Sequence, residues 1–419
     1  MCFPPVLTGH SIAYYAFRQS FCTIGGVKIL AIETSCDETA CAVVEDGTKV
    51  LSNVVASSAA IHEKYGGIVP EMAAREQLRS MIPVINEALL PLDRNYKSID
   101  SFTVAGKTTE KDRILPMHPI IKNHIDAIAV TVGPGLIGSL LVGVETAKTI
   151  AFVTGKPIIP VNHVVAHVYA NFVRNEQQTT HNKQQKNNGT MKQRSNKPIE
   201  FPAISLVVSG GHTELYLMES MKQLKWLGGT LDDAAGEAFD KTARLLGFGA
   251  QGGQAIERAA LKFRVKSSRL RRQAAFRVIL PRPMMKDESL NFSFSGLKTA
   301  VVREWTKYPH PTDEVTSAFA HEIQEAITDV LVNKTLRASR QHNATSILLS
   351  GGVAANMRLR EKFYSTVQPS NHPAIYCPPP ALCTDNAVSI ASCAYYLGKP
   401  KDWRKIEAEP DLSVEKNFS

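Results

Sequence analysis

The sequence predicts an α/β protein built from two similar lobes with a ligand cleft between them. Short apolar runs rich in β-forming residues alternate with longer segments of helical spacing, which is typical of mixed α/β domains. The tripeptide Ser-Gly-Gly follows an apolar strand twice, at residues 209–211 and 350–352, and this indicates a distant internal duplication. Loops at strand ends carry ligands in such folds, so we expect loops of both lobes to face one cleft.

The first lobe is expected to open with three antiparallel strands. Apolar runs rich in β-formers occupy 28–34, 40–44 and 50–56, and Glu45-Asp46-Gly47 supplies a turn. Pro70 suits the first turn of a helix over 70–90. A buried-type strand over 125–132 and a helix over 138–154 follow.

The second lobe repeats this pattern with strands over 203–208, 213–218 and 345–349. We therefore expect the lobes at 28–157 and 158–383, with a last helix at about 384–398 completing the first lobe. Residues 1–27 read as an N-terminal extension, either disordered or a start-site artefact. Residues 174–198, rich in Gln, Asn, Lys and Thr, read as a disordered insertion in the second lobe.

Composition limits the class of protein. Seven scattered cysteines without a Cys-x-x-Cys pair argue against a disulfide scaffold or a zinc ribbon and indicate a reducing compartment. No apolar run reaches the roughly 20 residues of a membrane span, so we expect no membrane association. The net charge of +9 is uneven, because residues 262–282 hold eight basic and no acidic residues. Such a run suits either a solvated loop or a nucleic-acid backbone.

His163 and His167 lie four residues apart, so on a helix they share one face and suit one metal ion. Such pairs also occur by chance in protein cores. Asp385, at the start of the last helix, is the candidate third ligand, and two histidines with one carboxylate suit iron or zinc. A zinc protease would need a glutamate where Val164 stands, which argues against peptide hydrolysis.

The two Ser-Gly-Gly loops can present backbone N–H groups to a phosphate, although a tight turn is the commoner explanation for each alone. Neither loop matches the Walker A or Rossmann pattern. Acidic residues over 232–240 open a predicted helix. They serve either the helix dipole or, as carboxylates, the ribose hydroxyls of a nucleotide.

Several motifs together resemble the TsaD-type tRNA threonylcarbamoyladenosine synthases, and the resemblance covers 28–397. The motifs are Glu33-Thr34-Ser35-Cys36-Asp37-Glu38-Thr39, Gly66-Gly67-Ile68-Val69-Pro70-Glu71, Gly133-Pro134-Gly135, Asn162-His163 through His167, Val208-Ser209-Gly210-Gly211-His212-Thr213, Ala238-Phe239-Asp240-Lys241, Phe292-Ser293-Phe294-Ser295-Gly296-Leu297-Lys298, Gly351-Gly352-Val353-Ala354-Ala355-Asn356 and Cys383-Thr384-Asp385-Asn386.

The resemblance implies two RNase H-like lobes of the actin-like (ASKHA) superfamily. It implies transfer of a threonylcarbamoyl group from threonylcarbamoyl-AMP to the adenosine 3′ of the anticodon, in tRNAs that read codons beginning with A. One divalent ion, Fe²⁺ first and Zn²⁺ second, would be held by His163, His167 and Asp385. The residues implied to hold the adenylate are Val207, Val208, Ser209, Gly210, Gly211, Asp240, Gly253 and Asn356, with Glu257 as a further member.

The chain also departs from the family pattern. The stretch Ala250-Gln251-Gly252-Gly253-Gln254 stands where the family usually carries Tyr-Pro-Gly-Gly-Pro, and Gln77 stands where many relatives have histidine. A base must take the proton of the adenine amine, and Asp37 or Glu38 is our candidate, with helix or turn capping as the alternative role.

The resemblance implies different partners for different sources. A bacterial, cytoplasmic enzyme would need the inactive paralogue TsaB and the ATPase TsaE, whereas an organellar enzyme of the mitochondrial matrix would be a homodimer. Two other functions remain as alternatives. One is a non-catalytic ATP-binding actin-like interaction module, and the other is a metalloprotease.

Overall fold

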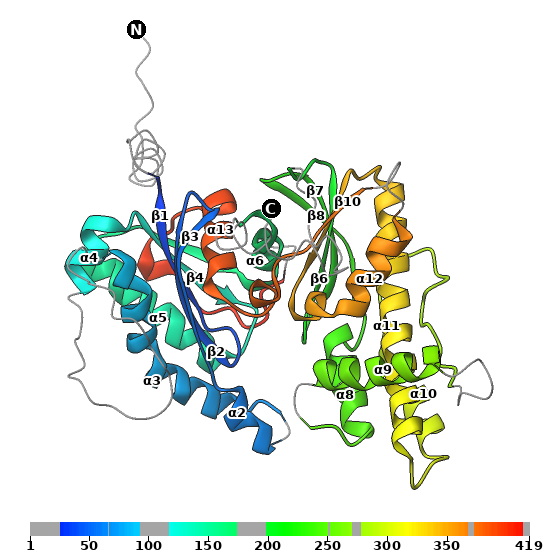
Figure 1. Ribbon diagram of the computed structural model, residues 1–419. Coiled ribbons are helices and arrows are strands. Elements are labelled where there is room, and N and C mark those ends of the chain that lie inside the picture. The colour runs from blue at the N-terminus through cyan, green and yellow to red at the C-terminus, as the bar shows by residue number, and fades with distance from the viewer. Residues whose placement is uncertain are drawn as a thin grey trace. The chain divides into compact units, whose positions relative to one another are not determined.

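The computed structural model describes residues 26–65, 67–92, 117–173, 198–249, 252–269, 278–367 and 373–413, without the side chains of residues 63 and 266–269. These residues form two compact units (Figure 1). The first unit contains residues 26–59, 69–173 and 386–413 of the described chain, and the second contains residues 60–68 and 198–385. The predicted extension (1–27) and insertion (174–198) lie almost entirely outside the described residues.

The first unit is built on a five-stranded sheet with the order β3-β2-β1-β4-β5. β1 pairs antiparallel with β2, which pairs antiparallel with β3, whereas β4 and β5 continue the sheet in parallel. The strands are β1 (Lys28–Glu33), β2 (Glu38–Glu45), β3 (Lys49–Ser57), β4 (Ala127–Gly133) and β5 (Ile158–Asn162).

Helices cover both faces of this sheet (Figure 1). α3 (Pro70–Leu89), α4 (Met117–His124) and α5 (Ile137–Thr154) pack on the face that carries Leu30, Ile32 and Val43. α13 (Ala387–Leu397) packs on β1 and β2 from the other side and also contacts α6 (His163–Tyr169). Because β4 is parallel to β1, the chain needs a long crossover between them, and α3 is part of it.

The second unit repeats the arrangement with the sheet order β10-β9-β6-β7-β8. Again an antiparallel meander comes first, and two parallel strands extend it on the side of its first strand. The strands are β6 (Ala203–Val208), β7 (Thr213–Ser220), β8 (Gln223–Gly229), β9 (Ser346–Ser350) and β10 (Ala374–Tyr376). The shared strand order confirms the prediction of two similar α/β lobes.

The main core of the second unit lies between its sheet and a set of helices, where Leu206 and Leu349 meet Phe239 and Ile327. These helices are α8 (Ala235–Leu245), α9 (Gly252–Arg269), α10 (Ser295–Trp305), α11 (Asp313–Gln341) and α12 (Met357–Thr366). Shorter elements are α2 (Ala59–His62) and the 3₁₀ turns η1 (Glu63–Tyr65), η2 (Leu90–Leu92), η3 (Ala170–Phe172), η4 (Gly352–Ala355), η5 (Pro380–Leu382) and η6 (Trp403–Lys405).

β5 and α6 follow residue 157, where the first lobe was expected to end. Both elements lie in the first unit, and β5 pairs with β4. Among the described residues, α5 is the one helix that is long and apolar enough to cross a membrane by length and composition alone. α5 packs on β4 and α3. The core helix of a globular domain can be equally long and apolar.

Candidate active site

The two histidines of the predicted metal pair lie on α6, directly after the end of β5. Asn162 ends the strand and caps the helix, because its Oδ1 accepts from the backbone N–H groups of Val164 at 2.9 Å and Val165 at 3.2 Å. His163 and His167 therefore occupy successive turns of one helix. Both are buried, and their ring centroids lie 4.7 Å apart.

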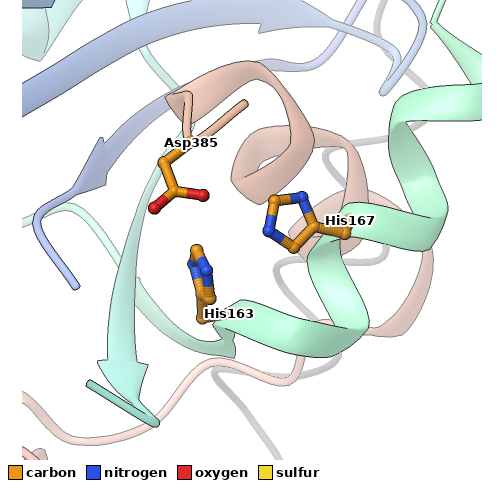
Figure 2. A group of neighbouring side chains, drawn as sticks. All are labelled: His163, His167 and Asp385. Atoms are coloured by element: carbon orange, nitrogen blue, oxygen red, sulfur yellow. The ribbon is translucent and has the colours of Figure 1, made fainter. Parts of the chain in front are cut away.

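Asp385 completes the predicted trio (Figure 2). It precedes Asn386, whose Oδ1 caps α13 by accepting from the N–H groups of Val388 and Ser389 at 3.0 and 3.2 Å. One ligand atom from each of Asp385, His163 and His167 lies within 4.8 Å of the others. Two imidazoles and a carboxylate at this spacing fit one divalent ion of the iron or zinc type.

A buried carboxylate next to this trio was not among the predicted site residues. Glu33, the last residue of β1, has Oε2 3.1 Å from Nδ1 of His163, and the Ser35 Oγ lies 3.2 Å from the same nitrogen. Thr131 on β4 donates its hydroxyl to Glu33, and the Ser35 N–H donates to it at 2.6 Å. One feature of the sequence could have indicated Glu33. It is a glutamate at the end of an otherwise apolar strand, in a position where a buried apolar residue would be expected.

Asp37 lies in the turn between β1 and β2, Glu38 begins β2, and both of these candidate bases are half-buried. Gln77 on α3 is fully buried and holds this turn, because its Nε2 donates to the carbonyl oxygens of Cys36 and Glu38, both at 3.0 Å. Ser58 donates its hydroxyl to the Asp37 carbonyl at 2.8 Å. These bonds engage peptide groups, so the role of the two carboxylates stays a prediction.

The predicted phosphate loop follows β6 in the second unit. Val207 and Val208 are fully buried in that strand, so their contact with a nucleotide stays a prediction. Gly210 and Gly211 are exposed, and a Cβ on either would meet nothing within 4 Å. Packing therefore does not require glycine at these two positions, whereas close approach of an anion would.

The second Ser-Gly-Gly loop differs in this respect. Gly351 has a φ of 84°, and an added Cβ would lie 2.4 Å from the Val208 carbonyl oxygen. Glycine at 351 is thus required by the fold, because the backbone there is left-handed and packs against the end of β6.

Two of the residues expected at the adenylate make structural contacts. Asn356 caps α12 by accepting from the Leu359 N–H at 3.0 Å, and Glu257 on α9 accepts from the Met357 N–H at 2.6 Å. Together they tie the start of α12 to α9. Burial raises the pKa of Glu257. Their contact with a nucleotide stays a prediction.

Asp240 on α8 faces the start of α9, where the backbone N–H groups of Gly253 and Gly252 donate to its carboxylate. Burial is the main cause that raises the pKa of Asp240. Asp232 has a different role from the one expected for helix-opening acids. It caps α10, accepting from the N–H groups of Phe294 and Ser295 at 2.8 and 3.2 Å, whereas α8 begins at Ala235.

The described ends of the basic run 262–282 are engaged in ion pairs. Arg264 lies 2.8 Å from Glu361, and Arg282 contacts both Glu322 and Asp329. Residues 270–277 and the side chains of 266–269 lie outside the described residues. The central arginines of the run therefore stay candidates for phosphate contact on sequence grounds alone.

The family profile of TsaD, described as tRNA N6-adenosine threonylcarbamoyltransferase, matches residues 49–107, 112–181 and 188–392. A protein of that name from Thermomicrobium roseum is 44% identical over 407 residues, covering 92% of this chain and 95% of the relative. One from Symbiobacterium thermophilum is 43% identical, covering 92% and 95%. A solved structure of full-length HypF is 11% identical, with a TM-score of 0.47 over 89% of this chain and 46% of that one.

Proposed function

The chain belongs to the TsaD family of tRNA N6-adenosine threonylcarbamoyltransferases, and on that premise we propose its reaction in detail. It is a transferase with tRNA as substrate. We propose that it moves a threonylcarbamoyl group from threonylcarbamoyl-AMP to the exocyclic amine of the adenosine 3′ of the anticodon, in tRNAs that read codons beginning with A, and releases AMP. The convergence of His163, His167 and Asp385 carries this proposal.

The chemistry requires an activated carbonyl, because the amine of adenine delocalises its lone pair into the ring and is a poor nucleophile. A divalent metal held by His163, His167 and Asp385 would supply Lewis-acid polarisation of that carbonyl. We assign Fe²⁺ as the first candidate and Zn²⁺ as the second, since both accept this donor set. Asp37 or Glu38 would take the proton that the amine loses.

The leaving AMP would be bound by the second unit. In the loop Ser209-Gly210-Gly211, the Ser209 N–H donates to the His212 carbonyl at 2.8 Å, whereas the N–H groups of Gly210 and Gly211 would be offered to the phosphate without a Cβ in the way. The backbone of Val207 and Val208 leads into this loop. Asp240 would accept from the ribose hydroxyls. Gly253, Glu257 and Asn356 would complete the nucleotide contacts from α9 and the start of α12.

Membership of a transferase family argues against both alternatives, the non-catalytic ATP-binding module and the metalloprotease. Val164 also occupies the position where a zinc protease of the His-Glu-x-x-His type needs its glutamate. The arrangement on α6 therefore fits group transfer better than peptide hydrolysis.

The test is to incubate the purified chain with threonylcarbamoyl-AMP and unmodified tRNA and to measure the modified nucleoside by mass spectrometry. His163→Ala and His167→Ala should each remove bound metal and nearly all transfer while the fold survives. His118→Ala, an exposed histidine on α4, is the matched control and should behave as wild type. Full activity of either variant after chelation would refute the metal-dependent mechanism.

We also propose that the first unit carries a partner surface. Leu78 and Ile82 on α3, and Ile137 and Leu141 on α5, are between 44 and 64% exposed, and α3 packs on α5. A bacterial, cytoplasmic enzyme would offer this surface to TsaB, with TsaE as a further subunit. An enzyme of the mitochondrial matrix would offer it to a second copy. Light scattering distinguishes these two partners, because a stable dimer of the pure, active chain would support binding of a second copy.

A further inference from the structure

Two hydrogen-bond donors and one imidazole nitrogen converge on the Glu33 carboxylate, which is 1% exposed at the end of β1. The Ser35 N–H reaches Oε1 at 2.6 Å, and the Thr131 hydroxyl donates to Oε2. Nδ1 of His163 lies 3.1 Å from Oε2. All four residues belong to the first unit, so the cluster is built by β1, β4 and α6 of one compact body.

The chemistry of these groups fixes which ring nitrogen of His163 carries the proton. Both oxygens of the Glu33 carboxylate already accept hydrogen bonds, from the Ser35 N–H and the Thr131 hydroxyl, so the nitrogen that faces Oε2 must be a donor, Nδ1–H. The Ser35 Oγ, 3.2 Å away, is a second acceptor for the same N–H. In a neutral imidazole with Nδ1 protonated, Nε2 holds the lone pair that a metal ion needs.

We propose that Glu33 is a positioning residue that holds His163 as the Nδ1–H tautomer, so that Nε2 is its metal-binding atom. Loss of an outer carboxylate that orients a metal-binding histidine typically changes metal affinity by about 10–100-fold. This inference rests on the proposed metal site but assigns a residue and a ligand atom that the proposed function leaves open.

Glu33 has a second consequence for the site. Its Oε1 accepts the Ser35 N–H, and Ser35 begins the turn that carries Asp37 and Glu38. One carboxylate thus connects the orientation of His163 with the backbone of the turn that holds the candidate bases. Loss of the carboxylate should therefore disturb the metal ligand and this turn together.

The first experiment measures Zn²⁺ affinity of the full chain by competition with a chromophoric chelator. Glu33→Gln keeps the shape but loses the charge and presents an N–H₂ group to the donors, so affinity should fall by about 10–100-fold. Glu45→Gln, on the partner strand and paired with surface lysines, is the control and should bind as wild type. Wild-type affinity in folded Glu33→Gln would overturn the proposal.

The second experiment needs no variant at Glu33 and so does not depend on its folding. A long-range proton–nitrogen NMR spectrum of the Zn²⁺-loaded chain with ¹⁵N-labelled histidine should show His163 protonated at Nδ1, with Nε2 bound to the metal. The His163 signals are assigned with His163→Gln. Protonation at Nε2 would overturn the inference while leaving the metal site intact. A wild-type chain that binds no Zn²⁺ or Fe²⁺ would instead overturn both the inference and the proposed metal site.

Discussion

Gly252 at the start of α9 lies so close to Asp240 on α8 that an added Cβ would come within 2.6 Å of the Asp240 Cα. The backbone N–H groups of Gly252 and Gly253 also donate to the Asp240 carboxylate. This close contact explains why glycine is needed at position 252. Asp240 therefore has two candidate roles, joining α8 to α9 and binding ribose.

Replacement of Asp240 separates these roles. Asp240→Ala should weaken adenylate binding by roughly 1.5–3 kcal/mol, the usual loss when a hydrogen bond to a charged group is removed. Isothermal calorimetry with a non-hydrolysable adenylate measures this, and urea unfolding of the same variant measures the helix contact. Unchanged affinity with reduced stability would assign Asp240 to the contact between α8 and α9 alone.

Replacement by alanine should have different effects at Gly211, in the predicted phosphate loop, and at Gly236, which packs against it. At Gly211 an added Cβ meets nothing within 4 Å, so Gly211→Ala should change stability by less than about 0.5 kcal/mol. It should still weaken adenylate binding by about tenfold, or about 1.4 kcal/mol, because the methyl group occupies the approach of the phosphate. At Gly236 the Cβ would lie 2.4 Å from the Ser209 carbonyl oxygen, so Gly236→Ala should cost about 1–3 kcal/mol of stability as well. Normal adenylate affinity in Gly211→Ala would place the phosphate elsewhere.

Glu214 on β7 makes the stability of the second unit depend on pH. Burial raises the pKa of its carboxyl from 4.5 to about 6, although Trp226 donates its indole N–H to Oε2 at 2.5 Å. The folded protein thus binds more protons than the unfolded chain between pH 4.5 and 6. Stability is fully present below pH 4.5 and falls as pH rises through 6, by up to about 2 kcal/mol.

Glu214→Gln should remove this dependence, because the neutral amide oxygen can still accept from Trp226. The variant and the wild type should have similar urea midpoints near pH 4.5. Above pH 6.5 the variant should be more stable by about 1–2 kcal/mol. An equal difference at both pH values would mean that Glu214 titrates at its ordinary value.

The strands and helices that the sequence predicted well are those whose apolar pattern lies within a few consecutive residues. The strands that became β1 and β6 were predicted because their short apolar runs are recognised within a few residues. β8 was not predicted, since Gln223–Gly229 alternates only weakly and is partly exposed. The two histidines of the site could be predicted from their spacing, because His163 and His167 lie one turn apart on one helix.

Long-range contacts could not be predicted in the same way. Glu33 and His163 are 130 residues apart, and Gln77 reaches the turn at Cys36 across 41 residues, so no local pattern connects them. The structure shows that the amide of Gln77 organises this turn through the hydrogen bonds that its Nε2 donates. A sequence pattern identifies candidate residues, whereas the residue that each of them contacts is known only from the folded structure.

The last prediction concerns the tRNA. Arg264 and Arg282, at the ends of the basic run, are occupied by ion pairs with acidic side chains, so they are poor candidates for phosphate contact. Of the four arginines between them, the clustered Arg269, Arg271 and Arg272 are therefore the ones to neutralise. Replacing all three by glutamine should weaken tRNA binding and leave adenylate binding unchanged.

The salt dependence of binding distinguishes phosphate contacts from a general loss of positive charge. Each lost contact should reduce the slope of log K against log salt by roughly 0.7–0.9, so three contacts reduce it by about 2–3. A control triple at exposed Lys222, Lys225 and Lys401 removes the same charge elsewhere and should keep the slope. If the arginine triple also keeps it, the run does not follow the phosphates, and the tRNA must be held by another surface or by a partner subunit.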